Sequence, residues 1–261
     1  MFQRGGEMRL SILGCSGGIS GDLRTTCLLL DEDTLIDCGT GAGDLDLTRM
    51  VGIDRIFLTH SHLDHVALLP MLADSAGNFR DEPLTVYALS ETIAILKTHV
   101  FNSHLWPDYT VQPKPEKPYI RFEAIEVGQS ILLKGGKITA LPAEHAVPAV
   151  GYLVDSGQAS FAFSGDTTYC EAFWVSLENT ENLRHLMIEA TFLESSREQA
   201  KISGHMTPGL LAKGFERLGR PVDILITHME AGRKEETMKE ILALSGKFGP
   251  KAVSRGQIFE F

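Results

Sequence analysis

The stretch Thr59–His65 reads "THSHLDH" and places three histidines and an aspartate within seven residues. The whole chain has only nine histidines, so this clustering needs an explanation. The apolar run Ile56–Leu58 precedes the cluster and an amphipathic run begins near Val66, which indicates a loop between a strand and a helix. Imidazole nitrogens and carboxylate oxygens are the ligands that zinc and similar divalent metals take. The sequence therefore predicts half of a metal site; a polar surface loop is the alternative interpretation.

This one loop can provide ligands to two metal ions. His60 and His62 can converge on one ion if the loop is extended, while Asp64 and His65 turn to a second. A two-metal site needs further ligands, and the chain offers three in similar settings, each just past an apolar strand-like run. These are His145, Asp166 and His228. Taken singly, each has an alternative interpretation: a loop histidine, a turn or helix-cap aspartate, and a histidine that only hydrogen-bonds at a strand end.

Strand-like and helical patterns are mixed along the whole chain, which predicts a layered α/β fold. The strand-like runs are Arg9–Leu13, Cys27–Leu30, Thr34–Asp37, Arg55–Leu58, Leu84–Ala88, Lys137–Leu141, Gly151–Val154, Ser160–Phe163, His185–Ile188 and Asp223–Ile226. The helical patterns are Val66–Ser75, Glu91–Phe101, Tyr169–Leu177, Pro208–Leu218 and Glu235–Ala243. Short connections in the first half favour meandering antiparallel strands. The three prolines of Val111–Pro118 forbid regular structure there, and we expect a surface excursion rather than a domain boundary.

Composition limits the class of protein. The chain has 261 residues and a net charge of −10, which argues against a broad nucleic-acid surface but permits a small anionic substrate. The four cysteines form no CxxC pair, and no stretch approaches the ~20 apolar residues of a membrane span. No apolar signal-peptide run follows the start. We therefore expect a cytoplasmic protein, with Met1–Glu7 as a loose tail.

A short internal repeat links the two halves of the chain. Asp54–His60 reads "DRIFLTH" and Asp223–His228 reads "DILITH", so in both a buried strand runs into Thr-His. Because sites in open α/β sheets gather at the carboxyl ends of strands, two related halves can deliver histidines to one shared edge. The repeat is short enough to arise by chance.

Together these motifs resemble those of the metallo-β-lactamase superfamily. The chain is similar to its ribonuclease Z-like group, and within that group most similar to class II 3′,5′-cyclic-nucleotide phosphodiesterases. The stretches that carry the resemblance are Gly14–Gly41, "HSHLDHVALLPMLADSA" at His60–Ala76, "SGDT" at Ser164–Thr167, "EATF" at Glu189–Phe192 and "GHMT" at Gly204–Thr207. The resemblance implies one domain over residues 1–261, folded as a four-layer αββα sandwich of two mixed sheets flanked by helices.

The resemblance also implies a ligand assignment. His60, His62 and His145 hold one metal, the other is held by Asp64, His65 and His228, and Asp166 bridges the two. Zinc is the implied ion, with manganese or iron as alternatives. Two divalent ions, two carboxylates and a bridging hydroxide leave a charge of about +1, which attracts a phosphodiester anion. The implied reaction is attack by that hydroxide, with Asp64 also able to accept its proton.

His205 and Glu189 are the candidates for protonating the leaving group. His205 precedes Thr207 and Pro208, an expected helix N-cap and first helical residue, so main-chain N–H groups would lie near a bound phosphate. In ribonuclease Z-like enzymes a His-Ser-Thr histidine does this work, and a His-Glu-Ala-Thr glutamate orients it. This chain keeps both residues but has Ile188 in place of the second motif's histidine. The alternatives are a capping histidine and a strand-end charge.

Several functions fit this ligand set. The leading hypothesis is hydrolysis of a 3′,5′-cyclic nucleotide to the 5′-nucleotide. The alternative of tRNA 3′-end processing is disfavoured, because ribonuclease Z has a long arm between the ligands that match His145 and Asp166, and here only twenty residues separate them. Another small phosphodiester, a lactone or a thioester is a third substrate class, and an inactive metal-binding scaffold is the non-enzymatic one.

The partners follow from these hypotheses. We expect a small-molecule phosphodiester as substrate, no nucleic acid and no membrane; the resemblance leaves a homodimer open. The Gly-rich turn Cys15–Gly18 either approaches the substrate or is a plain tight turn. The rings of Tyr87, His99, His104, Trp106 and Tyr109 are expected to pack in a loop core rather than stack on a base. His185 lies inside an apolar strand and is expected to be structural.

Overall fold

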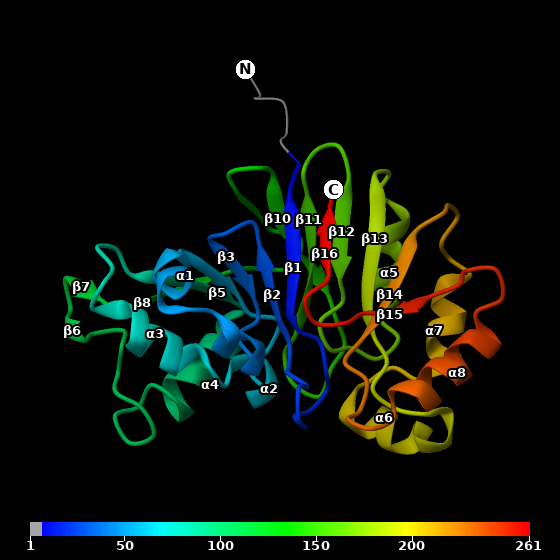
Figure 1. Ribbon diagram of the computed structural model, residues 1–261, viewed down its shortest axis with the longest axis horizontal. Helices are drawn as coiled ribbons and strands as arrows, with labels where there is room; N and C mark the ends of the chain where they lie inside the picture. The colour runs from blue at the N-terminus through cyan, green and yellow to red at the C-terminus, as the bar shows by residue number, and fades with distance from the viewer. Residues whose placement is uncertain (1–6) are drawn as a thin grey trace.

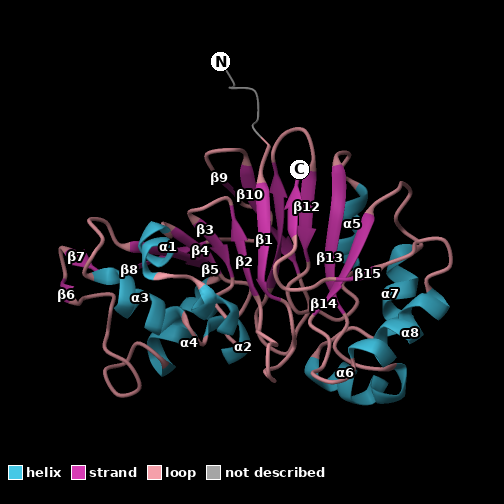
Figure 2. Ribbon diagram, viewed as in Figure 1, coloured by secondary structure: helices cyan, strands magenta, loops and turns pink. Residues whose placement is uncertain are grey.

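The computed structural model describes residues 7–261, and its strands form two large sheets and one small one (Figures 1 and 2). The first sheet has the order β16 (Ile258–Glu260), β1 (Arg9–Gly14), β2 (Cys27–Leu30), β3 (Thr34–Ile36), β4 (Arg55–Phe57), β5 (Leu84–Ala88), β8 (Ile120–Ala124). The second has the order β15 (Lys251–Ala252), β14 (Asp223–Thr227), β13 (Leu183–Glu189), β12 (Ser160–Phe163), β11 (Val150–Asp155), β10 (Lys137–Pro142), β9 (Ser130–Leu132). Met1–Gly6 of the expected tail lie outside the described residues.

Helices cover the outer face of each sheet, which gives four layers (Figure 2). On the first sheet these are α1 (Leu47–Gly52), α2 (Leu63–Val66), α3 (Leu69–Gly77) and α4 (Ser90–His99). On the second they are α5 (Glu171–Glu178), α6 (Arg197–Ser203), α7 (Pro208–Phe215) and α8 (Lys234–Leu244), and two 3₁₀ turns, η1 (Thr40–Asp44) and η2 (Glu194–Ser196), lie in the loops. One hydrophobic cluster fills the space between the sheets and one fills the space under each helix layer. The predicted αββα architecture is confirmed.

The strand β2 shows how the sequence builds these layers. Successive side chains of a strand point to opposite faces. Leu28 and Leu30 therefore join the cluster between the sheets, whereas Cys27 and Leu29 join the cluster under α3 and α4. Because both faces are buried, the strand reads as a continuous apolar run rather than as an alternation.

The predicted antiparallel meander is correct only for the first three strands. β1, β2 and β3 pair antiparallel, but β3, β4, β5 and β8 pair parallel to one another. The reason is that helices lie between these later strands in sequence, and a parallel neighbour needs such a crossover connection. The short connections at the start of the chain do not continue through its first half.

Proline decides two local differences from the sequence prediction. The helix expected over Val66–Ser75 is split into α2 and α3, because Pro70 in the first turn of α3 cannot continue a preceding helix. The expectation that prolines forbid regular structure in Val111–Pro118 is wrong, because β6 (Pro113–Lys114) and β7 (Lys117–Pro118) form a small exposed hairpin. In an antiparallel pair only alternate residue pairs exchange hydrogen bonds, so facing prolines can occupy the pair that needs no donor.

The other expected elements are confirmed, since every predicted strand and helix overlaps an observed one. The loops that follow β4 of the first sheet and β10, β12 and β14 of the second meet at one end of the sandwich. Within residues 7–261, no helix is long and apolar enough to cross a membrane.

Candidate metal centre

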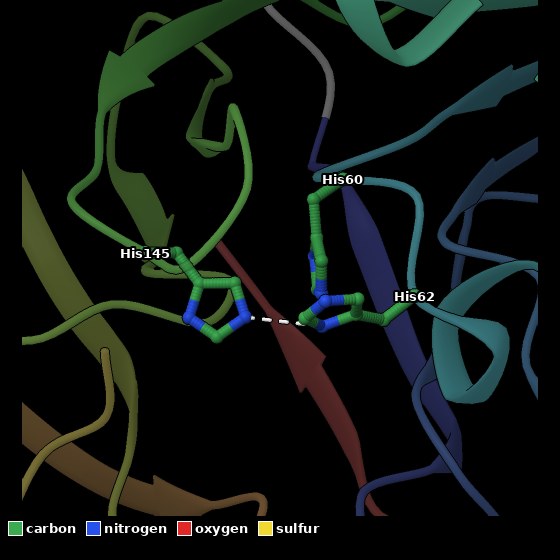
Figure 3. Close-up of side chains that lie close together, drawn as sticks. All are labelled: His60, His62 and His145. Atoms are coloured by element: carbon green, nitrogen blue, oxygen red, sulfur yellow. Dashed lines mark hydrogen bonds between the residues drawn. The ribbon is translucent and has the colours of Figure 1, made fainter. Parts of the chain in front are cut away.

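The loops after β4 and β10 bring together the first group of predicted ligands. His60, His62 and His145 each offer a ring nitrogen, and these atoms lie within 4.8 Å of one another. Figure 3 shows the three rings converging, with His145 Nε2 3.1 Å from His62 Nδ1. His145 presents Nε2 because its Nδ1 lies 2.9 Å from the Gly204 carbonyl oxygen, which accepts the ring proton. The group matches the first of the two predicted ligand sets.

The second predicted group lies beside the first. Asp64, His65, Asp166 and His228 also offer ligand atoms within 4.8 Å of one another. His228 Nε2 lies 3.0 Å from Asp64 Oδ2 and 3.2 Å from His65 Nε2. Asp166 joins the groups, because Oδ1 lies 3.3 Å from His65 Nε2 and Oδ2 lies 3.7 Å from His60 Nε2. The seven residues predicted as ligands are therefore one cluster.

Two orphaned atoms indicate that this cluster fits cations. His60 Nε2 and Asp166 Oδ1 are buried and have no hydrogen-bond partner. Buried polar atoms are nearly always satisfied, so atoms without a protein partner in such a cluster are suited to a metal. Histidine and carboxylate donors are those that divalent transition metals take. The donor set fits divalent metal ions.

The pKa shifts in the cluster also fit metal binding. Burial lowers the pKa of His60 well below its ordinary value, and neighbouring His65 adds to this, so the ring is neutral and free to act as a ligand. Burial raises the pKa of Asp166, but His228 and His65 lower it well below its usual range, so the carboxylate is ionised. Burial also lowers the pKa of His65, but Asp166 and Asp37 raise it well above normal. The cluster therefore favours positive charge.

Asp37 and Thr59 support the ligands from behind and were missed by the sequence analysis. Asp37 Oδ2 accepts from His65 Nδ1 at 2.7 Å, and Thr59 donates its N–H and its hydroxyl to the same carboxylate. Thr59 Oγ1 also lies 2.9 Å from His60 Nδ1. Such partners fix the tautomer and the orientation of a ligand histidine. The available signal was the acid at the end of the apolar run Thr34–Asp37.

Glu189 lies at the end of β13 and holds His205 at the other side of the cluster. His205 Nδ1 lies 2.7 Å from Glu189 Oε1. Burial lowers the pKa of His205, but the charge and hydrogen bond of Glu189 raise it to about 9. The His205 ring lies 4.8 Å from that of His145 and 5.6 Å from that of His228, centroid to centroid. His205 thus borders one ligand of each group.

The expected phosphate site at the start of α7 is wrong. Thr207 is the N-cap of α7 and Pro208 is its first residue, as predicted, but the Thr207 side chain makes no capping hydrogen bond. The side chain of Glu194 accepts from the Gly209 N–H at 2.8 Å instead. A carboxylate already neutralises this end of the helix, so we assign no anion to it.

The turn Cys15–Gly18 lies against the site. A Cβ at Gly17 would lie only 2.9 Å from the His228 carbonyl oxygen and 3.1 Å from His228 Nδ1. Glycine at this position therefore allows the turn to approach the ligand. The turn therefore lies directly beside His228, a predicted ligand, and its approach to a substrate stays a prediction.

The remaining candidates are structural. Phe101 and Tyr109 lie in the cluster under the helices of the first sheet, and Tyr87 stacks on Phe57 with centroids 4.7 Å apart. The expectation of a packed core is confirmed for these aromatics but is wrong for His99 and His104, which are exposed. His185 is buried beside Phe161 and Phe259 and lies in β13, away from the cluster.

Comparison with known proteins gives a consistent result. A family model described as "Beta-lactamase superfamily domain" matches residues 33–229. A Yersinia pestis protein named probable 3′,5′-cyclic-nucleotide phosphodiesterase is 25% identical, over 84% of this chain and 77% of that protein. Ribonuclease BN from Escherichia coli O139:H28 is 30% identical, over 57% of this chain and 50% of that protein. The crystal structure of unliganded yeast PDE1 has a TM-score of 0.78 at 16% identity, over 96% of this chain and 98% of that one, and shows the fold alone.

Proposed function

The chain belongs to the beta-lactamase superfamily and is a hydrolase of that superfamily, and from this premise we propose that it cleaves a 3′,5′-cyclic nucleotide to the 5′-nucleotide. The observation that carries the proposal is the pair of ligand groups joined at Asp166, with His205 beside them. The similarity to the Yersinia pestis phosphodiesterase supports the choice of substrate.

We assign one metal to each ligand group. His60, His62 and His145 would hold the first ion, Asp64, His65 and His228 would hold the second, and Asp166 would contact both. Zinc is the proposed ion, with manganese or iron as alternatives, because the donors are mostly imidazole. Two bound ions supply a nucleophile near neutral pH and positive charge for the phosphate.

Asp64 is the proposed proton acceptor. Its side chain is 29% exposed, whereas that of Asp166 is 2% exposed, so Asp64 is the carboxylate of the cluster that solvent and substrate can reach. Its Oδ2 lies 3.0 Å from His228 Nε2, so the two atoms face the same point of the cluster. A carboxylate in this position can act both as ligand and as acceptor of a proton from the attacking water.

His205 is the proposed proton donor to the leaving oxygen. Glu189 occupies its Nδ1, which leaves Nε2 for the substrate. With its pKa at about 9, the ring carries a proton at neutral pH. Its side chain is 11% exposed, so it is mostly buried but still reaches solvent beside the cluster. Glu189 acts as the positioning residue for this ring, without the second histidine of the family motif.

Processing of tRNA is the second candidate, and the similarity to ribonuclease BN favours it. Against it, β11, β12 and the tight turn that joins them at residues 156–159 together take up most of the chain between His145 and Asp166. This segment has no room for a tRNA-gripping arm. The net charge of −10 also opposes broad binding to a phosphate backbone.

The test is an assay of the purified protein after loading with Zn²⁺ or Mn²⁺. Cyclic AMP, cyclic GMP, 2′,3′-cyclic nucleotides, precursor tRNA and a bis-aryl phosphate are offered in parallel, with a chelated sample as the control. We expect hydrolysis of at least one 3′,5′-cyclic nucleotide to its 5′-nucleotide. Activity on the bis-aryl phosphate alone would reject the cyclic-nucleotide assignment, and cleavage of precursor tRNA alone would favour the second candidate.

A further inference from the structure

We infer that Thr191 is a positioning residue whose single hydroxyl anchors both a metal ligand and the glutamate that holds His205. The inference rests on the metal centre of the proposed function. Thr191 is buried in the loop that follows β13, two residues beyond Glu189. Its Oγ1 lies 2.8 Å from Glu189 Oε2, 3.0 Å from His228 Nδ1 and 3.1 Å from His205 Nδ1.

The proton inventory of a hydroxyl assigns these contacts. Thr191 has one proton to donate and can accept two. Two acceptors compete for its proton, the Glu189 carboxylate at 2.8 Å and the His228 carbonyl oxygen at 3.2 Å, and the shorter contact to the charged group takes it. The Nδ1 proton of His205 goes to Glu189 Oε1, which is closer at 2.7 Å. The Thr191 oxygen is then free to accept a hydrogen bond from the Nδ1–H of His228.

This last hydrogen bond matters because of what His228 does with its other nitrogen. Nε2 faces Asp64 at 3.0 Å and Asp166 at 3.3 Å, so it is the atom that would hold a metal and must carry no proton. A neutral imidazole has one proton, which must then lie on Nδ1. Thr191 Oγ1 accepts a hydrogen bond from this N–H and so selects the tautomer that binds metal.

Thr191 also fixes the position of the Glu189 carboxylate. The Thr191 N–H donates to Oε2 at 3.1 Å in addition to the hydroxyl, and the Thr167 N–H donates to Oε1 at 2.9 Å. Both carboxylate oxygens are therefore fixed, and Oε1 is aimed at His205. If Thr191 only stabilised the loop, its contacts to main-chain atoms would suffice and the contact to His228 Nδ1 would not be needed.

The experiment compares Thr191→Val, which keeps the shape and removes the hydroxyl, with Thr191→Ser, which keeps the hydroxyl. Thr237→Val is the matched control, because Thr237 is also buried but its Oγ1 has no hydrogen-bond partner. Zinc content per chain and zinc affinity are measured against a chromophoric chelator. We expect Thr191→Val to lose about 10–100-fold in affinity for one of two ions. Thr191→Ser and Thr237→Val should retain wild-type affinity for both.

Two results would overturn the inference: wild-type zinc affinity in Thr191→Val, or an equal loss in Thr191→Ser. If Thr191→Val does not fold, Thr191→Ala removes the same hydroxyl and is read in the same way. The metal measurement needs no substrate. A wild-type protein that binds two ions but hydrolyses no cyclic nucleotide therefore contradicts the proposed function alone.

Discussion

The Asp37 side and the Glu189 side of the centre use the same arrangement of groups. On the first, Asp37 follows β3, accepts from His65 Nδ1 at 2.7 Å and receives the hydroxyl of Thr59. On the second, Glu189 ends β13, lies 2.7 Å from the Nδ1 of its own histidine and receives the hydroxyl of a threonine in the same way. In both, that threonine also meets the Nδ1 of a second histidine, at 2.9 and 3.0 Å.

The two sides differ in the histidine that the carboxylate holds directly. The His65 side chain is 0% exposed and its Nε2 lies among the predicted ligand atoms. The His205 side chain is 11% exposed and lies at the border of the cluster. A buried carboxylate thus holds a predicted ligand that is sealed from solvent on one side, and a proposed proton donor that is partly exposed on the other. The two histidines differ in exposure rather than in the hydrogen bond that holds them.

The largest expected effect comes from His65→Ala. The variant should bind one metal ion fewer than the wild type and lose nearly all hydrolysis, because His65 Nε2 belongs to the second ligand group. Elemental analysis and turnover of a bis-aryl phosphate measure this. His104→Ala, which removes an exposed histidine, is the control. If His65→Ala still bound two ions, His65 would not be a metal ligand and Asp37 would not support one.

His205→Ala should keep both metal ions and lose about 10²–10⁴-fold in kcat, because a general acid contributes that much. The measurement is kcat and metal content on the same sample. His205 also lies within ligand distance of His145 and Asp166, so its role is testable by metal content. If the variant loses an ion, the ring is a ligand and the two sides do not differ.

Asp37→Asn and Glu189→Gln form a matched pair. Asp37→Asn should weaken the affinity for a metal ion by about 10–100-fold, because it removes the anion behind His65. Glu189→Gln should chiefly lower kcat, since the histidine it holds directly is the donor. Zinc titration and steady-state kinetics of both variants test this difference. Equal effects on metal affinity would show that the sides are interchangeable.

The smallest expected effect concerns His185. This buried histidine is a third arrangement beside the two sides of the centre, because its carboxylate partner, Asp223, is exposed. Burial lowers its pKa, and exposed Asp223 offsets this only in part. The unfolded chain then binds the proton first, so stability is lost as the pH falls below about 6.5. His185→Leu should lose less stability between pH 7.5 and 5.5. Urea midpoints of both chelated proteins measure this, and parallel losses would contradict it.

The apolar runs predicted the strands and pointed to the candidate ligands that follow them, whereas the αββα sandwich was implied by the family resemblance. The sequence predicted less of what supports these ligands. In the repeat of Asp54–His60 and Asp223–His228, Thr59 and Thr227 occupy matching positions, yet Thr227 donates to the Cys15 carbonyl oxygen. The partner that matches Thr59 is Thr191, which lies outside the repeat. Hydrogen bonds between distant loops leave no periodic signal.

The sequence alone determined the chemistry: imidazoles and carboxylates at strand ends, in an acidic chain without a basic arm. Only the tertiary structure decided how that chemistry is held. It placed Asp37 and Thr191 behind the predicted ligands, and it paired the Gly209 N–H at the start of α7 with the Glu194 carboxylate rather than leaving it for a phosphate. Donor types are local properties of residues, whereas the choice among several nearby acceptors depends on which strand ends the two sheets bring together.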